Sequence, residues 1–316
     1  MRSSLGRAAV VLLLLTTAAC TADDTTARPS GSTPAQPETS TSAAPADTSC
    51  NPRASLRPSG SLPEPGRMPA GSYMAEIYQR GRLVLGTSQD TLLFSSRNPF
   101  TGEIEGFDVD MGRQIAEAIF GDPDKLQIKV VAYDKRVDSA KDGTVDVVAD
   151  TMTANCTRWN SVDFSSIYYE SGQKILVSKD STIKGVDDLS GKKVCAAKGS
   201  TSYDNLGKLT SRPERVALAS FGDCLVAFQQ NEVDAISTDD TILIGMAAQD
   251  PYAKVVGDRY TEEPYGMAIS KDHPEFTRFV NAVLQKNREN GTWKATYKKW
   301  LGQFGPVPNP PVAQYR

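Results

Sequence analysis

Two segments of the chain share one pattern, in which a β-branched run ends in a group of polar residues. Val-Asp-Val-Val-Ala-Asp-Thr occupies residues 145–151 and Val-Asp-Ala-Ile-Ser-Thr-Asp occupies residues 233–239, each after a helix-like stretch and a turn. Such a run after a helix is typical of a buried parallel strand, and open parallel sheets bind ligands beyond the carboxyl ends of their strands. The pattern predicts two similar α/β lobes facing one cleft, although any two α/β units could share it by chance.

The chain has 316 residues, which corresponds to roughly two domains of about 150 residues each. Its formal net charge is -3 at pH 7 and its pI is near 5.4. A nucleic-acid-binding protein needs a clustered Lys and Arg surface, so this balance argues against that class. We expect a monomer that binds a small molecule and carries no cofactor.

Residues 1–20 have the form of a bacterial secretory signal. Arg2 and Arg7 precede an apolar run at residues 8–15, and small residues follow directly before Cys20. This ending resembles a lipobox, in which the cysteine is lipidated and becomes the mature N-terminus, although a threonine stands where leucine is usual. An uncleaved membrane helix is the alternative, but the run is far shorter than the roughly 20 residues that span a bilayer. We therefore predict export and lipid anchoring at Cys20 to the outer face of the cell membrane.

Residues 21–72 are predicted to form a tether and an irregular lead-in. From residue 21 to residue 49 they are mostly Ser, Thr, Pro, Ala and Asp, with almost no large apolar side chain. Such a composition buries too little surface to offset the entropy of ordering the chain. A flexible segment of this length reaches roughly 30 Å, from about 5 to 6 Å times the square root of its length. The Pro- and Gly-rich residues 58–71 continue the irregular region.

Four cysteines remain after the lipidation site, and an exported protein can join them as disulfides. Three pairings are possible. Cys195 lies on a predicted strand and Cys224 begins the helix after the next strand, so we expect these two to pair. Cys50 would then pair with Cys156 and hold the end of the tether beside the first lobe. A metal site is the alternative, but Cys-x-x-Cys spacing is lacking and His273 is the only histidine, so we expect no metal.

Hydrophobic patterning divides the folded part into two lobes. We predict that lobe I covers residues 73–172 and 265–302, that lobe II covers residues 173–264, and that a Pro-rich tail at residues 303–316 is frayed. The chain is expected to change lobe near residues 169–172. The strands expected in lobe I lie at residues 82–87, 125–132, 145–149 and 265–269, with helices at 109–119, 136–141 and 274–300, the last interrupted at 290–291. The strands expected in lobe II lie at residues 175–177, 193–197, 216–220 and 233–237, separated by helical segments.

Polar residues after the first repeated strand suit a bound carboxylate. Thr151 and Thr153 supply hydroxyl and backbone N–H groups there. Arg158 follows shortly after, and the fork of an arginine guanidinium matches the two oxygens of a carboxylate. The alternative is that Arg158 is an ordinary surface cation.

A second candidate anion site lies in the second half of the chain. Ser200 and Thr201 stand between a predicted strand and a helix, where free N–H groups and the helix dipole attract negative charge. Asp239, at the end of the second repeated strand, offers a carboxylate to an ammonium group. As alternatives, Ser200 or Thr201 is an N-cap and Asp239 caps the following helix. Taken together, the charged groups describe a cleft for a free amino acid.

The order of these features resembles the family-3 extracellular solute-binding proteins of bacterial amino-acid importers, over about residues 82–301. The motifs that carry the resemblance are Gly-Glu-Ile-Glu-Gly-Phe-Asp-Val-Asp at residues 102–110, Arg158 with Val-Asp-Phe-Ser at residues 162–165, Asp-Leu-Ser-Gly-Lys at residues 188–192 and Asn-Gly-Thr at residues 290–292. With the lipid signal and the residues at 200–202 and 238–240, the chain resembles the glutamine- and glutamate-binding lipoproteins of actinobacteria.

This resemblance implies a two-lobed α/β fold like that of periplasmic binding proteins of type II, with a two-strand hinge and a central ligand cleft. It implies that Thr153 and Arg158 hold the α-carboxylate of the ligand and that Thr201 caps this group from the other lobe. It also implies that Asp239 binds the α-ammonium group. The expected partners are therefore a free amino acid and an ABC permease, with the membrane reached through the lipid anchor.

The end of the first strand departs from the family pattern. Ser88 and Thr91 stand where many relatives carry an acidic residue and an aromatic residue, and Leu93 replaces a common proline. Ser88 remains a candidate ligand contact, but the resemblance does not determine the roof over the ligand side chain.

Arg136 bears on the choice of ligand through charge balance. Glutamate carries two carboxylates and one ammonium, which two arginines and one aspartate would neutralise, and Arg136 matches an arginine of relatives that bind acidic amino acids. Around glutamine, a buried arginine without a partner would cost roughly several kcal/mol. This argument predicts glutamate or aspartate over glutamine or asparagine. The alternative is that Arg136 is a solvated helix residue.

Two other functions fit the same fold. One is a dehydratase-like enzyme acting on a cyclic carboxylate, which would need a positioned acid or base. His273 stands at a predicted outer helix start and no Ser/His/Asp set is available, so we expect no catalytic residues. The other is a sensor that reports amino-acid levels to a membrane signalling protein, and this function would use the same closed state.

Overall fold

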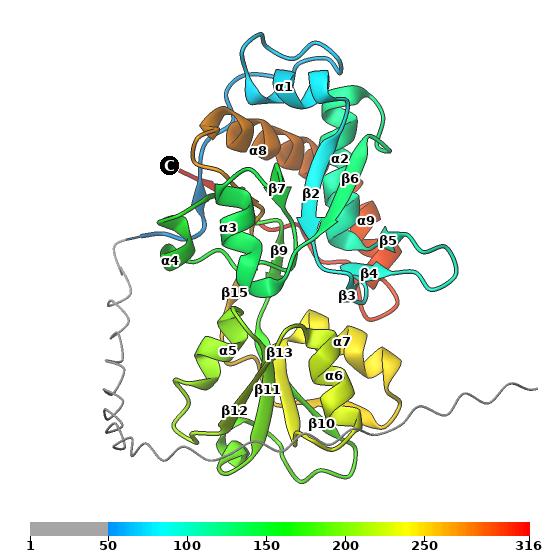
Figure 1. Ribbon diagram of the computed structural model, residues 1–316, viewed down its shortest axis with the longest axis vertical. Coiled ribbons are helices and arrows are strands. Elements are labelled where there is room, and N and C mark those ends of the chain that lie inside the picture. The colour runs from blue at the N-terminus through cyan, green and yellow to red at the C-terminus, as the bar shows by residue number, and fades with distance from the viewer. Residues whose placement is uncertain (1–49) are drawn as a thin grey trace, which may run out of the picture. The chain divides into compact units, whose positions relative to one another are not determined.

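The computed structural model describes residues 50–316. The predicted signal peptide, Cys20 and nearly all of the predicted flexible tether lie outside this part of the chain. The described residues build two five-stranded sheets that are linked by a pair of antiparallel strands, with helices packed on each sheet (Figure 1). No helix within residues 50–316 has the length and the apolar character needed to cross a membrane.

Lobe I contains the sheet with the strand order β6-β2-β7-β16-β8. The sheet strands are β2 (Leu83–Thr87), β6 (Leu126–Val130), β7 (Val147–Val148), β8 (Asp163–Phe164) and β16 (Ala268–Ile269). The helices are α1 (Tyr73–Arg80), α2 (Phe107–Phe120), α3 (Arg136–Lys141), α4 (Cys156–Trp159), α8 (Pro274–Glu289) and α9 (Thr292–Leu301), with a 3₁₀ turn at Tyr133–Lys135. Helix α2 buries Met111, Ile115 and Ile119 in the core, because apolar residues three to four apart share one helix face.

Lobe II contains the sheet with the strand order β12-β11-β13-β10-β14. The strands are β10 (Gln173–Ser178), β11 (Lys193–Ala197), β12 (Glu214–Leu218), β13 (Ala235–Asp239) and β14 (Ala253–Val256). The helices are α5 (Thr201–Leu206), α6 (Phe221–Gln229) and α7 (Asp240–Gln249), with a 3₁₀ turn at Val186–Leu189. Helix α6 begins with a capping box between Ser220 and Asp223, which satisfies backbone N–H groups at its N-terminus.

The two repeated segments occupy equivalent places in their sheets. Strand β7 lies between the parallel strand β2 and the antiparallel strand β16. Strand β13 lies between the parallel strand β11 and the antiparallel strand β10. The repeat therefore reflects a shared local topology and is not a chance likeness.

The lobes are joined by β9 (Tyr169–Ser171) and β15 (Glu263–Tyr265), which pair antiparallel with Glu263 opposite Ser171. The chain passes from one sheet to the other through these two strands. The single strand predicted at residues 265–269 is wrong in extent, because the chain leaves the hinge after Tyr265 and enters the lobe I sheet only at Ala268. Two backbone segments therefore connect the lobes.

The C-terminal tail is not frayed, contrary to the prediction. Strand β17 (Gln314–Tyr315) pairs in parallel with β1 (Ala54–Ser55), which belongs to the predicted lead-in. The Arg288 guanidinium donates to the carbonyl oxygen of Pro311 at 3.0 Å. Both ends of the described chain thus pack on lobe I.

Both predicted cysteine pairs are present. Cys50 and Cys156 form one disulfide with a Cα–Cα distance of 5.8 Å. Cys195 and Cys224 form the other with a Cα–Cα distance of 5.7 Å. No group of three or more potential metal ligands occurs within residues 50–316.

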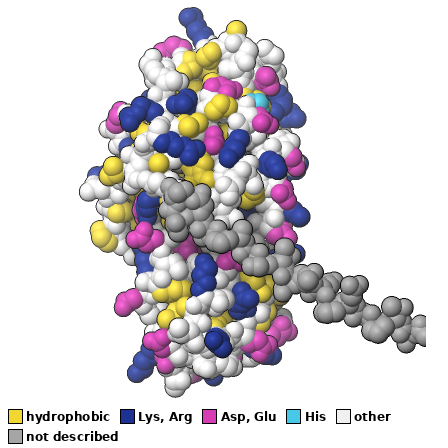
Figure 2. Space-filling view, turned by 90° about the vertical axis from the view of Figure 1, so that its left-hand side faces the viewer, with side chains coloured by type: hydrophobic (Ala, Val, Ile, Leu, Met, Phe, Trp, Pro, Cys, Tyr) yellow, Lys and Arg dark blue, Asp and Glu magenta, His cyan; other side chains and the backbone are white. Residues whose placement is uncertain are grey.

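A small three-stranded sheet of β3 (Asp90–Thr91), β4 (Ser95–Arg97) and β5 (Ile104–Glu105) extends from lobe I towards lobe II. The backbone N–H of Gly222 in α6 donates to Asp90 at 3.2 Å. This contact joins the lobes on a side away from the hinge. On the face drawn in Figure 2, Lys and Arg are interspersed with Asp and Glu, so that face carries no continuous basic area outside the grey atoms.

Candidate functional site

The residues that follow β7 bring polar groups to the edge of lobe I. Thr151 has a φ of 43°, in the left-handed region that threonine rarely adopts. Its backbone N–H donates to the Asp108 carboxylate at 2.7 Å, which helps to hold this conformation. The Thr151 hydroxyl oxygen is buried and has no hydrogen-bond partner within the described residues. The hydroxyl of Thr151, a predicted ligand contact, is therefore free of hydrogen bonds to the described residues.

Arg158 is held by carbonyl oxygens and not by an acid. It lies in α4, whose N-cap Asn155 accepts a hydrogen bond from the Arg158 backbone N–H. Its guanidinium donates to the carbonyl oxygens of Thr153 at 2.7 Å and of Gly199, in lobe II, at 3.2 Å. No carboxylate of residues 50–316 lies within 4.0 Å of it. Burial, followed by the neighbouring charge of Arg136, lowers the pKa of Arg158 to about 9. Arg158 is therefore a partly buried cation without an ion-pair partner within 4.0 Å among the described residues, although the more distant charges of Glu263, Asp204 and Asp239 favour its charged form.

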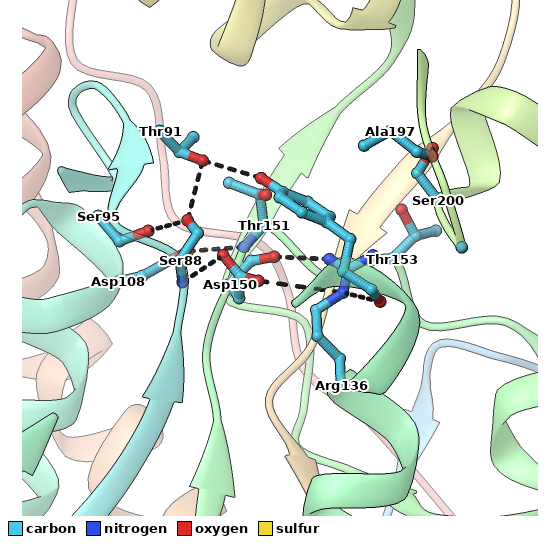
Figure 3. Close-up of polar contacts among 12 residues, drawn as sticks. Ser88, Thr91, Ser95, Asp108, Arg136, Asp150, Thr151, Thr153, Ala197 and Ser200 are labelled. Atoms are coloured by element: carbon cyan, nitrogen blue, oxygen red, sulfur yellow. Dashed lines mark hydrogen bonds and ion pairs between the residues drawn. The ribbon is translucent and has the colours of Figure 1, made fainter. Parts of the chain in front are cut away.

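Arg136 has a different environment. Its side chain is only 3% exposed, so it is not a solvated helix residue. The guanidinium donates to the carbonyl oxygens of Tyr133 at 3.0 Å and of Asp150 at 2.8 Å, and it lies 3.9 Å from the Asp150 carboxylate (Figure 3). It also stacks over the Tyr133 ring at 4.4 Å. The charge argument from the sequence assumed an arginine without a partner, whereas Asp150 lies within ion-pair distance but makes no side-chain hydrogen bond to it. Burial raises the pKa of Asp150, and the charge of Arg136 lowers it.

Ser88 belongs to a cluster of hydroxyl groups beside this ion pair. Its backbone N–H donates to Asp150 at 3.0 Å, and its hydroxyl lies 2.9 Å from that of Thr91 and 2.7 Å from that of Ser95. The Thr91 hydroxyl in turn lies 2.8 Å from that of Tyr133. Figure 3 shows the labelled members of this cluster beside Asp150. The sequence interpretation placed Ser88 here but missed Ser95, Tyr133 and Asp150.

Only one of the two carboxylate oxygens of Asp239 is hydrogen-bonded within the described residues. One of its oxygens accepts from the Tyr265 hydroxyl at 2.6 Å, and the other is buried without a hydrogen bond from the described residues. Burial raises the pKa of Asp239 well above its ordinary value, and the nearby Glu263 raises it further. Although Asp239 precedes α7, its side chain makes no capping hydrogen bond. The helix-cap alternative for Asp239 is therefore wrong.

Thr153 and Thr201 meet across the two lobes, with their hydroxyl oxygens 3.3 Å apart. Each hydroxyl donates to one oxygen of the Glu263 carboxylate, at 2.6 Å from Thr153 and 2.8 Å from Thr201. A threonine hydroxyl has one hydrogen to donate. While these bonds persist, neither hydroxyl can donate to a ligand carboxylate, and the role that the resemblance implied for Thr153 and Thr201 stays a prediction. Glu263 itself was missed.

Ser200 serves as a helix cap. Its hydroxyl donates to the carbonyl oxygen of Ala197 at 2.6 Å and accepts from the backbone N–H of Tyr203 at 3.1 Å. The N-cap alternative for Ser200 is correct, and the side chain is fully used by the fold. The adjacent Lys198 forms an ion pair of 3.2 Å with Asp134 of lobe I, which is another contact between the lobes.

The site residues come together around the hinge. Thr153 forms an isolated β-bridge with Tyr265. The Tyr265 hydroxyl in turn donates a hydrogen bond to Asp239. His273 stands at the start of α8 and stacks on the ring of Tyr73 with centroids 3.7 Å apart, as expected for a structural residue. The arrangement offers fixed charges of both signs and suits static recognition of a small charged molecule.

Comparison with known proteins identifies the family. Residues 83–303, more than half of the chain, match the model of bacterial extracellular solute-binding proteins, family 3. The chain is 37% identical over 243 residues to the ABC transporter glutamine-binding protein GlnH of Bacillus subtilis, covering 77% of this chain and 89% of that protein. It is 28% identical over 256 residues to the glutamate-binding protein GluB of Corynebacterium efficiens, covering 77% of this chain and 86% of that protein.

Solved structures show the same fold. An ancestral arginine-binding protein bound to glutamine has a TM-score of 0.66 and 31% identity, covering 71% of this chain and 99% of that one. A mutant of the arginine-binding protein ArgBP from T. maritima has a TM-score of 0.67 and 29% identity, covering 72% and 99%. With its two lobes, two-strand hinge and matching motifs, the chain belongs to the family-3 bacterial extracellular solute-binding proteins.

Proposed function

We propose that this protein binds a free L-amino acid between its lobes, with glutamine as the preferred ligand, and delivers it to an ABC permease. The observation that carries the proposal is a guanidinium without an ion-pair partner close to a buried carboxyl oxygen without a hydrogen-bond donor. Arg158 has no acidic partner within the described residues, and Asp239 has a buried oxygen without a donor. A free amino acid carries the two complementary charges on adjacent groups.

The α-carboxylate belongs at Arg158. A guanidinium binds a carboxylate through two parallel N–H···O bonds, and such charge-assisted bonds are stronger than those to the neutral carbonyl oxygens that Arg158 now contacts. Burial and the charge of Arg136 already lower the pKa of this arginine. A bound carboxylate would restore the stability of its charged form.

The α-ammonium group belongs at Asp239, whose buried free oxygen needs a donor. The Thr153 hydroxyl assists there in a role different from the one first expected. Its hydrogen points to Glu263, so its oxygen can only accept. An ammonium group has three hydrogens to donate and no acceptor, whereas a carboxylate can only accept.

The side-chain end of the cleft favours a neutral amide. Asp150 lies 3.9 Å from Arg136, so a second carboxylate from glutamate would have to share the guanidinium with a buried acid. The four hydroxyls of Ser88, Thr91, Ser95 and Tyr133 share three hydrogen bonds, so the cluster keeps one hydrogen to donate and oxygen lone pairs to accept, as an amide requires. We therefore replace the preference for glutamate or aspartate with a preference for glutamine. The names of the two relatives above include both ligands, so this preference is supported by the charge count alone.

Titration calorimetry with the twenty amino acids tests the proposed function. We expect glutamine to bind at least about tenfold more tightly than glutamate, a difference of about 1.4 kcal/mol. Tight glutamate binding with little affinity for glutamine would refute the proposed ligand. Binding of no amino acid would refute the function as a whole.

Lipidation of Cys20 is proposed to keep the protein at the membrane, close to the permease. The printed name of the Bacillus subtilis relative places that protein with an ABC transporter. Fractionation of cells that express the wild type and Cys20→Ala tests the anchor. We expect the wild type in the membrane fraction and the variant outside it. Crosslinking in intact membranes should then capture a permease, and capture of a signalling receptor alone would support the sensor instead.

A further inference from the structure

Glu263 is a buried carboxylate at the centre of the contact between the lobes. It lies on the hinge strand β15 and is only 2% exposed. Each of its two carboxylate oxygens accepts two hydrogen bonds. One oxygen receives Thr153 at 2.6 Å and Thr201 at 2.8 Å, and the other receives Asn205 at 2.9 Å and Thr261 at 2.8 Å.

These four donors come from three parts of the fold. Thr153 follows β7 in lobe I, whereas Thr201 and Asn205 lie in α5 of lobe II. Thr261 precedes β15 on the hinge segment itself. One carboxylate on the hinge therefore joins a threonine from each lobe, and both of these threonines were candidate ligand contacts.

We infer that Glu263 is a positioning residue that stabilises the closed lobes and orients the Thr153 and Thr201 hydroxyls, so that their oxygens face the ligand as acceptors. This inference rests on the proposed function. It concerns a residue that reaches the ligand only through the two threonines.

The hydrogen-bond count explains why the closed arrangement depends on the charge. When the lobes open, groups of lobe II must move away from groups of lobe I, so the carboxylate cannot keep all four donors in place. A buried acceptor that loses its donors costs free energy. A ligand, in turn, shifts the opening equilibrium only by its different affinity for the two states. The hydrogen bonds of Glu263 to both lobes therefore stabilise the closed state independently of the ligand's own contacts.

The conservative variant Glu263→Gln separates this role from simple packing. Glutamine has almost the same shape, but its amide carries one acceptor oxygen and one NH₂ donor. Four donors converge on Glu263, so the NH₂ group must face at least one pair of them. The variant therefore keeps the volume and loses the acceptor pattern.

Glu262 offers a matched control next to it in the chain. Its side chain is 85% exposed and pairs with Arg53 at 3.0 Å on the outside of the hinge. Glu262→Gln removes the same charge one residue away and leaves the Thr153 and Thr201 hydroxyls untouched.

The experiment measures the affinity for glutamine by calorimetry and the dissociation rate by stopped flow, for the wild type, Glu263→Gln and Glu262→Gln. We expect Glu263→Gln to bind at least about tenfold more weakly, mainly through faster dissociation, and Glu262→Gln to stay within about twofold of the wild type. Glutaramic acid, which is glutamine without its α-amino group, should lose less affinity in Glu263→Gln, because the threonine oxygens serve the ammonium. A purely structural defect would weaken both ligands equally.

Thermal unfolding of the free protein shows whether Glu263→Gln folds. If it does not fold, Asn205→Ala removes one donor from lobe II, and it should also accelerate dissociation. Wild-type affinity in the folded Glu263→Gln or, failing that, in Asn205→Ala would overturn the inference and leave the proposed function standing. A wild type that binds no amino acid would instead overturn the proposed function, and this inference with it.

Discussion

Arg136 and Arg158 lie close enough for the charge of one to lower the pKa of the other, but among residues 50–316 only Arg136 has a carboxylate within 4.0 Å. The Arg136 guanidinium lies 3.9 Å from the buried carboxylate of Asp150 and stacks on Tyr133. Arg158 contacts two carbonyl oxygens, and burial lowers its pKa. The difference shows that a buried arginine predicts a negatively charged ligand group only if no carboxylate of the protein already lies beside it. By this criterion, we expect Arg158 to bind a ligand carboxylate and Arg136 not to do so.

The largest effect is expected at Arg158. Arg158→Met removes the only proposed cationic partner of the α-carboxylate, so we expect the affinity for glutamine to fall about a thousandfold or more, which is about 4 kcal/mol. Calorimetry measures the loss. Arg113, a partly exposed arginine that pairs with Asp124, provides the control Arg113→Met, which should bind like the wild type. Near-normal affinity of Arg158→Met for glutamine would show that Arg158 does not bind the α-carboxylate.

Asp239→Asn should have the next largest effect. The amide oxygen can still accept from Tyr265, but the negative charge for the ammonium group is lost. We expect roughly a hundredfold weaker binding of glutamine, about 3 kcal/mol. Glutaramic acid is the internal control, since a ligand without an ammonium group should not bind less well to this variant. An equal loss for both ligands would place the ammonium elsewhere.

Asp150→Asn tests the paired arginine directly. This variant leaves the charge of Arg136 without its acid, so a side-chain carboxylate becomes the better ligand group. We expect the ratio of glutamate affinity to glutamine affinity to rise about tenfold, which is about 1.4 kcal/mol. Arg136→Met provides the opposite change and should not favour glutamate. If the ratio stays constant in Asp150→Asn, the Arg136–Asp150 pair does not set the preference.

Much of the fold followed from local patterns in the sequence. The two repeated strands, the change of lobe and both disulfides depend on short runs and on the order of elements. The partners of the two arginines could not be read in the same way. Asp150 belongs to the repeated segment, but whether its carboxylate faces Arg136 depends on how α3 packs against β7.

The other misses have the same physical origin. Strands β1 and β17 pair although some 260 residues separate Ala54 from Gln314, and a two-residue strand gives too short a pattern to predict. Glu263 reads as an ordinary acid beside Glu262, because only the closed lobes bring four donors to it. The density of Ser and Thr between Thr87 and Ser96 was the one signal that could have indicated the hydroxyl cluster.

The smallest effect concerns stability and Asp108, which lies behind Thr151. Burial raises the pKa of Asp108 to about 7 from an ordinary value of 3.8, Asp150 raises it and Arg136 lowers it. A raised carboxyl pKa means that the associated stability is present below pH 4 and is lost as the pH rises towards 7, by at most about 1.4 kcal/mol per pH unit. Asp150→Asn should lower the pKa of Asp108 and flatten the loss, because it removes a negative charge that raises this pKa.

Urea unfolding of the ligand-free protein at pH 5, 6 and 7 measures this dependence, with Asp108→Asn as the variant that lacks the titrating group. A wild type whose pH dependence matches that of Asp108→Asn would show that Asp108 is ionised throughout this range.

A crystal structure of the complex with glutamine tests the central claim most directly. We expect the α-carboxylate within hydrogen-bond distance of the Arg158 guanidinium and the ammonium group on the free oxygen of Asp239. The Arg136 guanidinium should remain beside Asp150, with the side-chain amide among the hydroxyls of Ser88, Thr91 and Tyr133. A ligand bound in the reverse direction, or an Arg136 that has left Asp150 to bind the ligand, would contradict the account.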